Sequence, residues 1–273
     1  MSETFLIERD DDNRAVVIMT MNRPEAMNSF NIAQFHAMYN GFRNIADDTT
    51  VRAIVLTGRG RAFCAGADIS EGFGSSGFDT DIEHVDGIPR DTGGMLNLAI
   101  ASLNIPVIAA INGPAVGVGL TMTLPCDFRI AAKGQKYAFP FVRRGIVFDG
   151  VASFYLPKLV GFSKATQWSL TGSYIDPVEA LQSGLFTELL EKDEVLPRAL
   201  TLARDIATNC SPEAVTLNKR LLRATLHGTS SPFEAHMAES AHLNRMFHAR
   251  DCTEGVNAFL EKRSPTFNDR TTQ

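Results

Sequence analysis

The sequence is poor in the residues that define several classes of protein. Its 273 residues include only four cysteines, Cys64, Cys126, Cys210 and Cys252. These cysteines lie far apart, form no CxxC pair and have no histidine at zinc-ligand spacing. The sequence therefore predicts neither a disulfide framework nor a metal site.

The sequence also has fewer basic than acidic residues. Lysine and arginine number 26 against 31 aspartates and glutamates, which gives a formal net charge of −5 at pH 7. Such a chain lacks the basic surface that nucleic acids or an anionic membrane would require. Residues 1–4 show no basic segment followed by an apolar run. We therefore expect no signal peptide and a reducing cytoplasmic location.

One long stretch, residues 92–126, has no charged residue at all. A membrane-spanning helix is not the best interpretation, because Pro106, Pro114 and Pro125 would interrupt it. The stretch is more typical of a buried strand and a buried helix joined by a glycine-bearing turn.

Strand-like and helix-like segments alternate in the first two thirds of the chain, which predicts an α/β fold. Apolar spacing predicts a helix within 28–48, capped by Ser29 or Asn31. The expected strands are 5–7, 15–21, 51–57, 107–111, 127–132 and 136–139. From about residue 163 the pattern turns mainly helical, with expected helices at 194–208, 212–227, 233–249 and 253–263. We therefore expect an α/β core over 1–200 and a helical region over 201–273.

Two glycine-bearing corners, 60–69 and 111–120, each follow a predicted buried strand. Small residues there let a ligand approach backbone amides, and a helix start offers free N–H donors. Taken alone, such corners are more often ordinary turns. Neither matches a Walker loop or a GxGxxG fingerprint. The Gly-, Ser- and Asp-rich segment 71–94 is expected to be an excursion that borders a site.

Four ordered segments together resemble the crotonase family, also called the enoyl-CoA hydratase/isomerase family. They are 22–28 (NRPEAMN), 62–68 (AFCAGAD), 112–119 with Cys126-Asp127, and 255–263 (GVNAFLEKR). The resemblance implies a crotonase (ClpP-like) α/β spiral of ββα units with C-terminal helices that form a homotrimer or a dimer of trimers. It also implies an acyl-CoA thioester substrate, with CoA as part of that substrate and no further cofactor.

The resemblance also implies roles for individual residues. The backbone N–H groups of Ala67 and Val118 would form an oxyanion hole, which stabilises negative charge on a thioester oxygen. The residues implied in CoA binding are Arg23, Met27, Ala65, Ala67, Asp68, Ile69 and Gly117. Phe259 and Lys262 would reach the CoA of a neighbouring subunit.

The acid/base residues distinguish the possible reactions. Family hydratases use two glutamates, and the aligned positions here hold Thr121 and Phe141. Because neither side chain is a useful proton acceptor at neutral pH, the sequence does not predict two-glutamate hydration.

Asp149 lies where family isomerases carry their single catalytic carboxylate. One carboxylate is sufficient to move a double bond from the 3- to the 2-position of an enoyl-CoA, and apolar neighbours would raise its pKa. The alternative is that Asp149 caps the helix that begins near Gly150. At the level of function, two alternatives stay open: a hydratase-like activity, and an acyl-CoA-binding protein without catalysis.

Overall fold

The computed structural model describes residues 4–69, 83–226, 228 and 231–270. At its centre is a six-stranded sheet in the order β1-β2-β3-β6-β8-β11. The strand β1 is antiparallel to β2, and the remaining neighbours are parallel. The strands are β1 Phe5–Arg9, β2 Val16–Met21, β3 Ala53–Gly58, β6 Val107–Ile111, β8 Phe128–Ala132 and β11 Glu188–Leu190.

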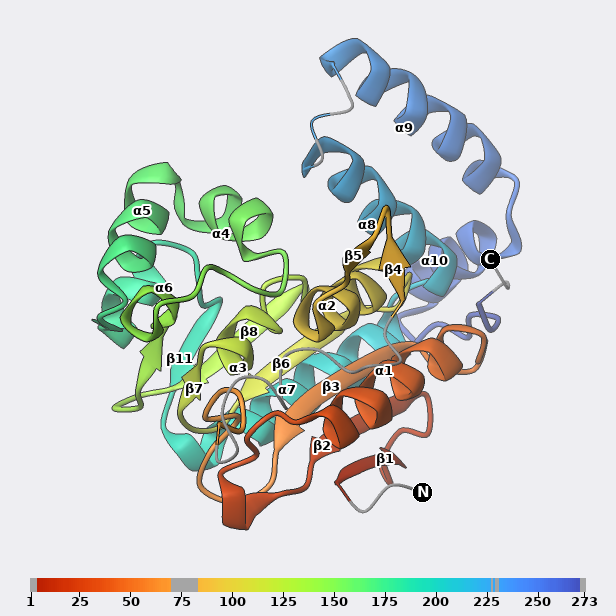
Figure 1. Cartoon of the computed structure of the whole chain (residues 1–273). Coiled ribbons are helices and arrows are strands. Elements are labelled where there is room, and N and C mark those ends of the chain that lie inside the picture. The colour runs from red at the N-terminus through yellow and green to blue at the C-terminus, as the bar shows by residue number, and fades with distance from the viewer. Residues whose placement is uncertain (1–3, 70–82, 227, 229–230, 271–273) are drawn as a thin grey trace.

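Helices cover both faces of this sheet, and the central strands β3 and β6 are accordingly buried along their whole length. Successive side chains of a strand point to opposite faces. In β3, Ile54 and Leu56 belong to the core that also contains residues of α1 (Ile32–Ala46) and α2 (Thr92–Ser102). Ala53 and Val55 instead share a core with residues of α7 (Lys192–Asn209). Figure 1 shows α7 and the α1–α2 pair on opposite sides of the strands.

The other elements surround this core. Small strands form a second sheet, β10-β9-β7, and a hairpin, β4-β5. Figure 1 shows the last three helices, α8, α9 and α10, at one end of the molecule, away from α4, α5 and α6. The bounds are η1 Pro24–Ala26, β4 His84–Val85, β5 Ile88–Pro89, β7 Ala115–Val116, α3 Val118–Thr121, β9 Tyr137–Ala138, η3 Phe141–Arg144, α4 Ala152–Val160, α5 Phe162–Thr171, β10 Tyr174–Ile175, α6 Pro177–Gln182, α8 Pro212–Leu226, α9 Pro232–Phe247 and α10 Arg250–Glu261.

The structure confirms the predicted strands and the helix at 28–48, which the Asn31 side chain caps through the Gln34 amide. The region after residue 163 is mainly helical, as predicted, and it also contains the short strands β10 and β11. The predicted division at residue 200 falls inside α7, whose apolar side lies along the sheet up to Ala207. Residues 71–82 of the predicted excursion lie outside the described residues, and α2 already begins at Thr92.

The uncharged stretch 92–126 forms α2, β6, β7 and α3, most of whose residues are buried. In the described ranges, no helix has both the length and the apolar character needed to cross a membrane.

Candidate active site

The two glycine-bearing corners lie side by side at the carboxyl ends of β3 and β6. The amide of Cys64 donates to the Pro114 carbonyl at 3.1 Å, and the Val116 amide donates to the Cys64 carbonyl at 3.1 Å. A β-carbon on Gly119 would lie 2.2 Å from the Cys64 carbonyl oxygen. Glycine is therefore required at this position, because any side chain would push the corners apart.

Ala67 and Val118, one from each corner, line the same cavity. Val118 is the first residue of α3, so its N–H group has no acceptor within the helix. Among the described residues, neither the Ala67 nor the Val118 amide donates a hydrogen bond to the protein. These two donors are therefore available to a ligand in the cavity.

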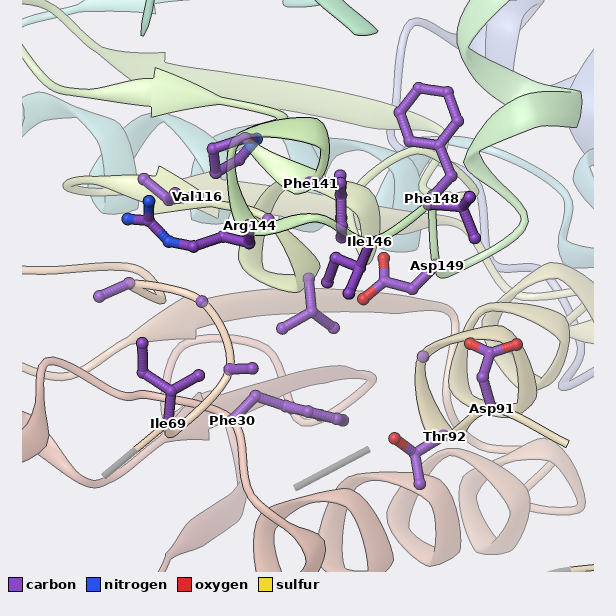
Figure 2. A pocket seen from close by; sticks show the side chains of 18 of the residues that line it. Phe30, Ile69, Asp91, Thr92, Val116, Phe141, Arg144, Ile146, Phe148 and Asp149 are labelled. Atoms are coloured by element: carbon purple, nitrogen blue, oxygen red, sulfur yellow. The ribbon is translucent and has the colours of Figure 1, made fainter. Parts of the chain in front are cut away.

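The cavity has a volume of about 600 Å³ and is lined mainly by apolar groups. Figure 2 shows Asp149 on its wall, and Arg144 on the opposite side of the view, near Val116 and Ile69. Residues from five segments form the lining: Phe30, Ala65–Ala67 with Ile69, Asp91–Gly93, Val116–Val118 and Pro140–Phe141 with Arg144–Asp149. An apolar cavity with a few polar groups is typical of a small-molecule site.

Asp149 lies between η3 and α4, and its carboxylate accepts a hydrogen bond from the Thr121 hydroxyl at 2.7 Å. Burial raises the pKa of Asp149 to about 7. The Thr121 hydrogen bond opposes this rise, whereas the negative charge of Asp91 adds to it. A carboxylate with this pKa can both accept and donate a proton near neutral pH.

The predicted alternative, that Asp149 caps the following helix, is wrong. The residue that caps α4 is Val151, which has a left-handed backbone and no side-chain cap hydrogen bond. The Asp149 side chain is therefore not engaged at the start of α4, and it lines the cavity instead.

Comparison with known proteins agrees with this geometry. The model of the family described as enoyl-CoA hydratase/isomerase matches residues 11–270. The chain belongs to this family.

Relatives of the same family cover nearly the whole chain. Enoyl-CoA hydratase ACTT3 of Alternaria alternata is 44% identical over 95% of this chain and 84% of its own length. The 2,3-dehydroadipyl-CoA hydratase of Escherichia coli is 32% identical over 93% of this chain and 96% of its own. A crystal structure of a probable enoyl-CoA hydratase/isomerase from Mycobacterium abscessus superposes with a TM-score of 0.88 at 35% identity, covering 97% of this chain and 99% of that one. The chain therefore has the crotonase fold that the sequence motifs predicted.

In this member of the family, one of the two positions expected for hydratase glutamates bonds to Asp149, and the other lines the same cavity. Thr121 donates the hydrogen bond to its carboxylate. Phe141 packs edge-on against Phe148, with ring centroids 5.7 Å apart. Neither residue can transfer protons as a glutamate does, but one orients Asp149 and the other helps to keep its surroundings apolar.

The residues predicted to bind CoA divide into two groups. Ala65, Ala67, Ile69 and Gly117 line the cavity. Arg23, Met27 and Asp68 do not belong to this lining. Their part in CoA binding stays a prediction.

The second group instead supports the first corner. Arg23 forms an ion pair with Asp68 at 2.9 Å and also donates to the Ser29 carbonyl. The Met27 carbonyl accepts from the Ala65 amide at 3.1 Å. The buried side chain of Asn28 donates to the carbonyls of Arg59 and Ala62. The NRPEAMN segment therefore fixes the position of the corner that carries Ala67.

Phe259 and Lys262 lie at the end of α10, and Phe259 is 82% exposed. Neither lines the cavity of its own chain. In Figure 1, α10 is at the end of the molecule away from α3. Their service to a neighbouring subunit stays a prediction.

Sequence reasoning missed Asp91, Gly93 and Arg144 as residues of the cavity. Asp91 was placed in the excursion, although Asp before Thr-Gly-Gly and an apolar run is a signal for a helix start. That signal predicts a cap but not the proximity of Asp91 to Asp149. Only the folded chain places Arg144 in the lining.

Proposed function

We propose that this enzyme isomerises the double bond of a 3-enoyl-CoA to the 2-position, with Asp149 as its single acid/base group. The observation that carries the proposal is the position of Asp149. Its carboxylate lines the same apolar cavity as Ala67 and Val118, whose amides have no protein acceptor among the described residues.

The first step is removal of a proton from C2 of the substrate by the ionised Asp149. The electron pair of the broken C–H bond forms a double bond between C1 and C2, and the thioester oxygen becomes negative. The Ala67 and Val118 amides would stabilise this oxygen, and one such donor is typically worth about 10²–10³ in rate. In the second step, the protonated Asp149 returns the proton to C4, while the double bond moves to C2–C3.

The raised pKa of Asp149 suits both steps. A carboxylate with a pKa of about 7 is a stronger base than an ordinary aspartate, and it is still substantially ionised at neutral pH. Its protonated form is correspondingly stable during the lifetime of the dienolate. One group can therefore accept and return the same proton.

Hydration of a 2-enoyl-CoA is a second candidate, because the named relatives in Alternaria and Escherichia coli are hydratases. Family hydratases use two glutamates for this reaction, and this chain has Thr121 and Phe141 in their place. Hydration would therefore depend on a different group to hold the water. This difference favours isomerisation.

The replacement Asp149→Asn tests the proposal. The amide has nearly the same shape but cannot accept the proton, so we expect the conversion of 3-enoyl-CoA to fall by about 10²–10⁴. The matched control is Asp176→Asn, which changes an exposed cap of α6 and should keep full activity. Formation of the 2-enoyl product is followed by its absorbance over a panel of acyl chain lengths.

Three results would contradict the proposal. If Asp149→Asn kept wild-type turnover, Asp149 would not be the base. If the wild-type protein hydrated 2-enoyl-CoA but did not isomerise 3-enoyl-CoA, the hydratase reading would replace ours. Binding of acyl-CoA with no turnover would favour a binding protein without catalysis.

We also propose that the enzyme assembles as a trimer or a dimer of trimers through its C-terminal helices. Phe233, Leu243 and Phe247 of α9 and Leu260 of α10 are all more than half exposed in the single chain. Burial of such side chains between subunits would remove apolar surface from water.

A further inference from the structure

A second carboxylate lies beside Asp149 at the start of α2. Asp91 caps this helix, since its Oδ1 accepts from the Gly94 amide at 2.5 Å. The same oxygen accepts from the amide of Gly150, the residue that follows Asp149, at 3.4 Å. Asp91 is therefore linked to the segment of Asp149 as well as to its own helix. Figure 2 shows both side chains on the same side of the cavity.

Two glycines make room for this pair of carboxylates. A β-carbon on Gly93 would lie 3.3 Å from the Asp149 carboxylate and 3.3 Å from Asp91 Oδ1. A β-carbon at position 93 would therefore be in van der Waals contact with both carboxylates. A β-carbon on Gly94 would lie 2.5 Å from Asp91 Oδ2, which is too close. Side chains in the first turn of α2 would therefore separate or displace the two acids.

The charged groups around Asp149 leave Asp91 as its main electrostatic neighbour. The Cys64 thiol behind the first corner is neutral, because burial raises its pKa to about 12. Arg90, next to Asp91 in sequence, pairs with Glu83 at 2.7 Å. Arg144 of η3 lies on the other side of the cavity view (Figure 2). In the described part of the chain, no cation forms an ion pair with Asp149.

Asn97 of α2 strengthens the connection between this helix and Asp149. Its buried amide donates to the Thr121 carbonyl at 2.8 Å and to the Gly150 carbonyl at 2.5 Å. Helix α2 therefore holds the Asp149 segment at two points, Asp91 to the Gly150 amide and Asn97 to the Gly150 carbonyl. A change in the first turn of α2 would therefore also change the position of Asp149.

We propose that Asp91 is a positioning residue of the active site: it holds the Asp149 segment through the Gly150 amide and acts on the Asp149 carboxylate by its negative charge. The proposal rests on the proposed function, in which Asp149 is the acid/base group. The charge of Asp91 disfavours ionisation of its neighbour, which agrees with the raised pKa of Asp149. It makes the ionised Asp149 a stronger base and favours its protonated form beside the dienolate.

The experiment separates the charge of Asp91 from its capping role. Asp91→Asn and Asp91→Ser both keep an oxygen that can cap α2 but remove the charge. Asp91→Glu keeps the charge. The protonation of Asp149 is followed by NMR of protein with ¹³C-labelled aspartate carboxyls, with the Asp149 signal assigned by its absence in Asp149→Asn.

In Asp91→Asn and Asp91→Ser we expect the titration midpoint of Asp149 to fall by about half a pH unit or more, as for the loss of a nearby like charge. Asp91→Glu should restore at least part of the wild-type midpoint. The matched control is Asp176→Asn, because Asp176 also caps a helix with its side chain but is not part of the cavity. The acidic limb of the pH–rate profile should move with the NMR midpoint.

An unchanged midpoint in folded Asp91→Asn and Asp91→Ser would overturn the proposal and leave Asp91 as a cap only. The NMR titration needs no turnover, so its result is independent of the proposed reaction. Whether Asp149 is the base is decided separately, by the turnover of Asp149→Asn. The proposed role of Asp91 and the proposed role of Asp149 as the base can therefore be contradicted independently of each other.

Discussion

The cavity around Asp149 and the junction around Asp127 place the same kind of side chain in opposite surroundings. At the junction, where α8 meets the sheet, Asp127 accepts from Lys219 Nζ at 2.6 Å and from the Val107 amide at 2.7 Å. Arg223 adds a second positive charge at 3.6 Å. In the cavity, Asp149 has the neutral hydroxyl of Thr121 and the negative Asp91 instead.

This difference determines what each carboxylate can do. A carboxylate that is paired with cations and hydrogen-bonded, as Asp127 is, serves structure by linking α8 to the segment before β8. A carboxylate in an apolar cavity without a cation is costly to ionise, and its pKa rises into the range useful for proton transfer. Burial acts on cations in the opposite direction and lowers the pKa of Lys219 to about 8. Surroundings, rather than residue type, therefore separate the reactive aspartate from the structural one.

The largest loss of stability is expected at the junction. Lys219→Met removes the ammonium group from Asp127 and from the Ile105 carbonyl, which it also contacts at 2.6 Å. The Asp127 carboxylate would then keep only the Val107 amide and the more distant Arg223 as partners. We therefore expect the free energy of unfolding to fall by about 3 kcal/mol. Denaturant unfolding at pH 7 measures this change. Activity per folded molecule should stay near the wild-type value, since Lys219 does not line the cavity.

Lys164→Met is the matched control, because Lys164 pairs with Glu179 at the surface. Both side chains of this pair are partly exposed, at 39% and 32%, so we expect the pair to contribute less than about 1 kcal/mol. If both variants lost the same stability, the junction would not differ from a surface pair, and the comparison of the two regions would fail.

The next prediction concerns the stability cost of the reactive carboxylate. Folding raises the pKa of Asp149 from 3.8 to about 7, so the folded state binds the proton more tightly than the unfolded chain. Stability is then lost as the pH rises from about 4 to about 7. Asp149→Asn cannot ionise, and its free energy of unfolding at pH 8 should exceed that of the wild type by about 2–4 kcal/mol.

The excess should disappear near pH 4, where the wild-type carboxylate is protonated in the folded state. Asp127→Asn provides the contrast, because it leaves Lys219 without its negative partner and should lower stability at pH 7. Denaturant unfolding at several pH values distinguishes the cases. An equal gain for Asp149→Asn at pH 4 and pH 8 would point to packing rather than charge.

Sequence reasoning succeeded where the signal is local. The corners at Ala67 and Val118 follow apolar strands and contain glycines, and the ordered motifs placed both corners in one family. Asp149 could be proposed because its neighbours are apolar and its position matches that family's isomerases. Asn31 could be proposed as a cap for the same reason, since capping depends on only a few adjacent residues.

The remaining features depend on contacts between distant segments. The strand β11 has only three residues and forms because β8 offers an unpaired edge, which no local pattern reveals. The link from Asp91 to the Gly150 amide requires α2 to pack beside the Asp149 segment. Thr121 could be recognised as a missing glutamate, but its hydrogen bond to Asp149 is visible only in the folded chain.

That hydrogen bond gives the smallest expected effect. In Thr121→Val the buried side chain keeps its shape but loses the hydroxyl that donates to Asp149. Since this bond lowers the pKa of Asp149, its removal should raise the pKa and move the acidic limb of the pH–rate profile upward. The shift is opposite to that expected for Asp91→Asn. At pH 7 we expect activity to fall a few-fold, with recovery at higher pH.

Thr123→Val is the matched control, because this threonine is also fully buried but its hydroxyl donates to the Leu120 carbonyl and not to Asp149. Its pH–rate profile should coincide with that of the wild type. A downward shift in Thr121→Val, or an equal shift in both variants, would mean that the hydroxyl does not stabilise the ionised Asp149. The raised pKa of Asp149 in the cavity would then result from burial and from Asp91 alone.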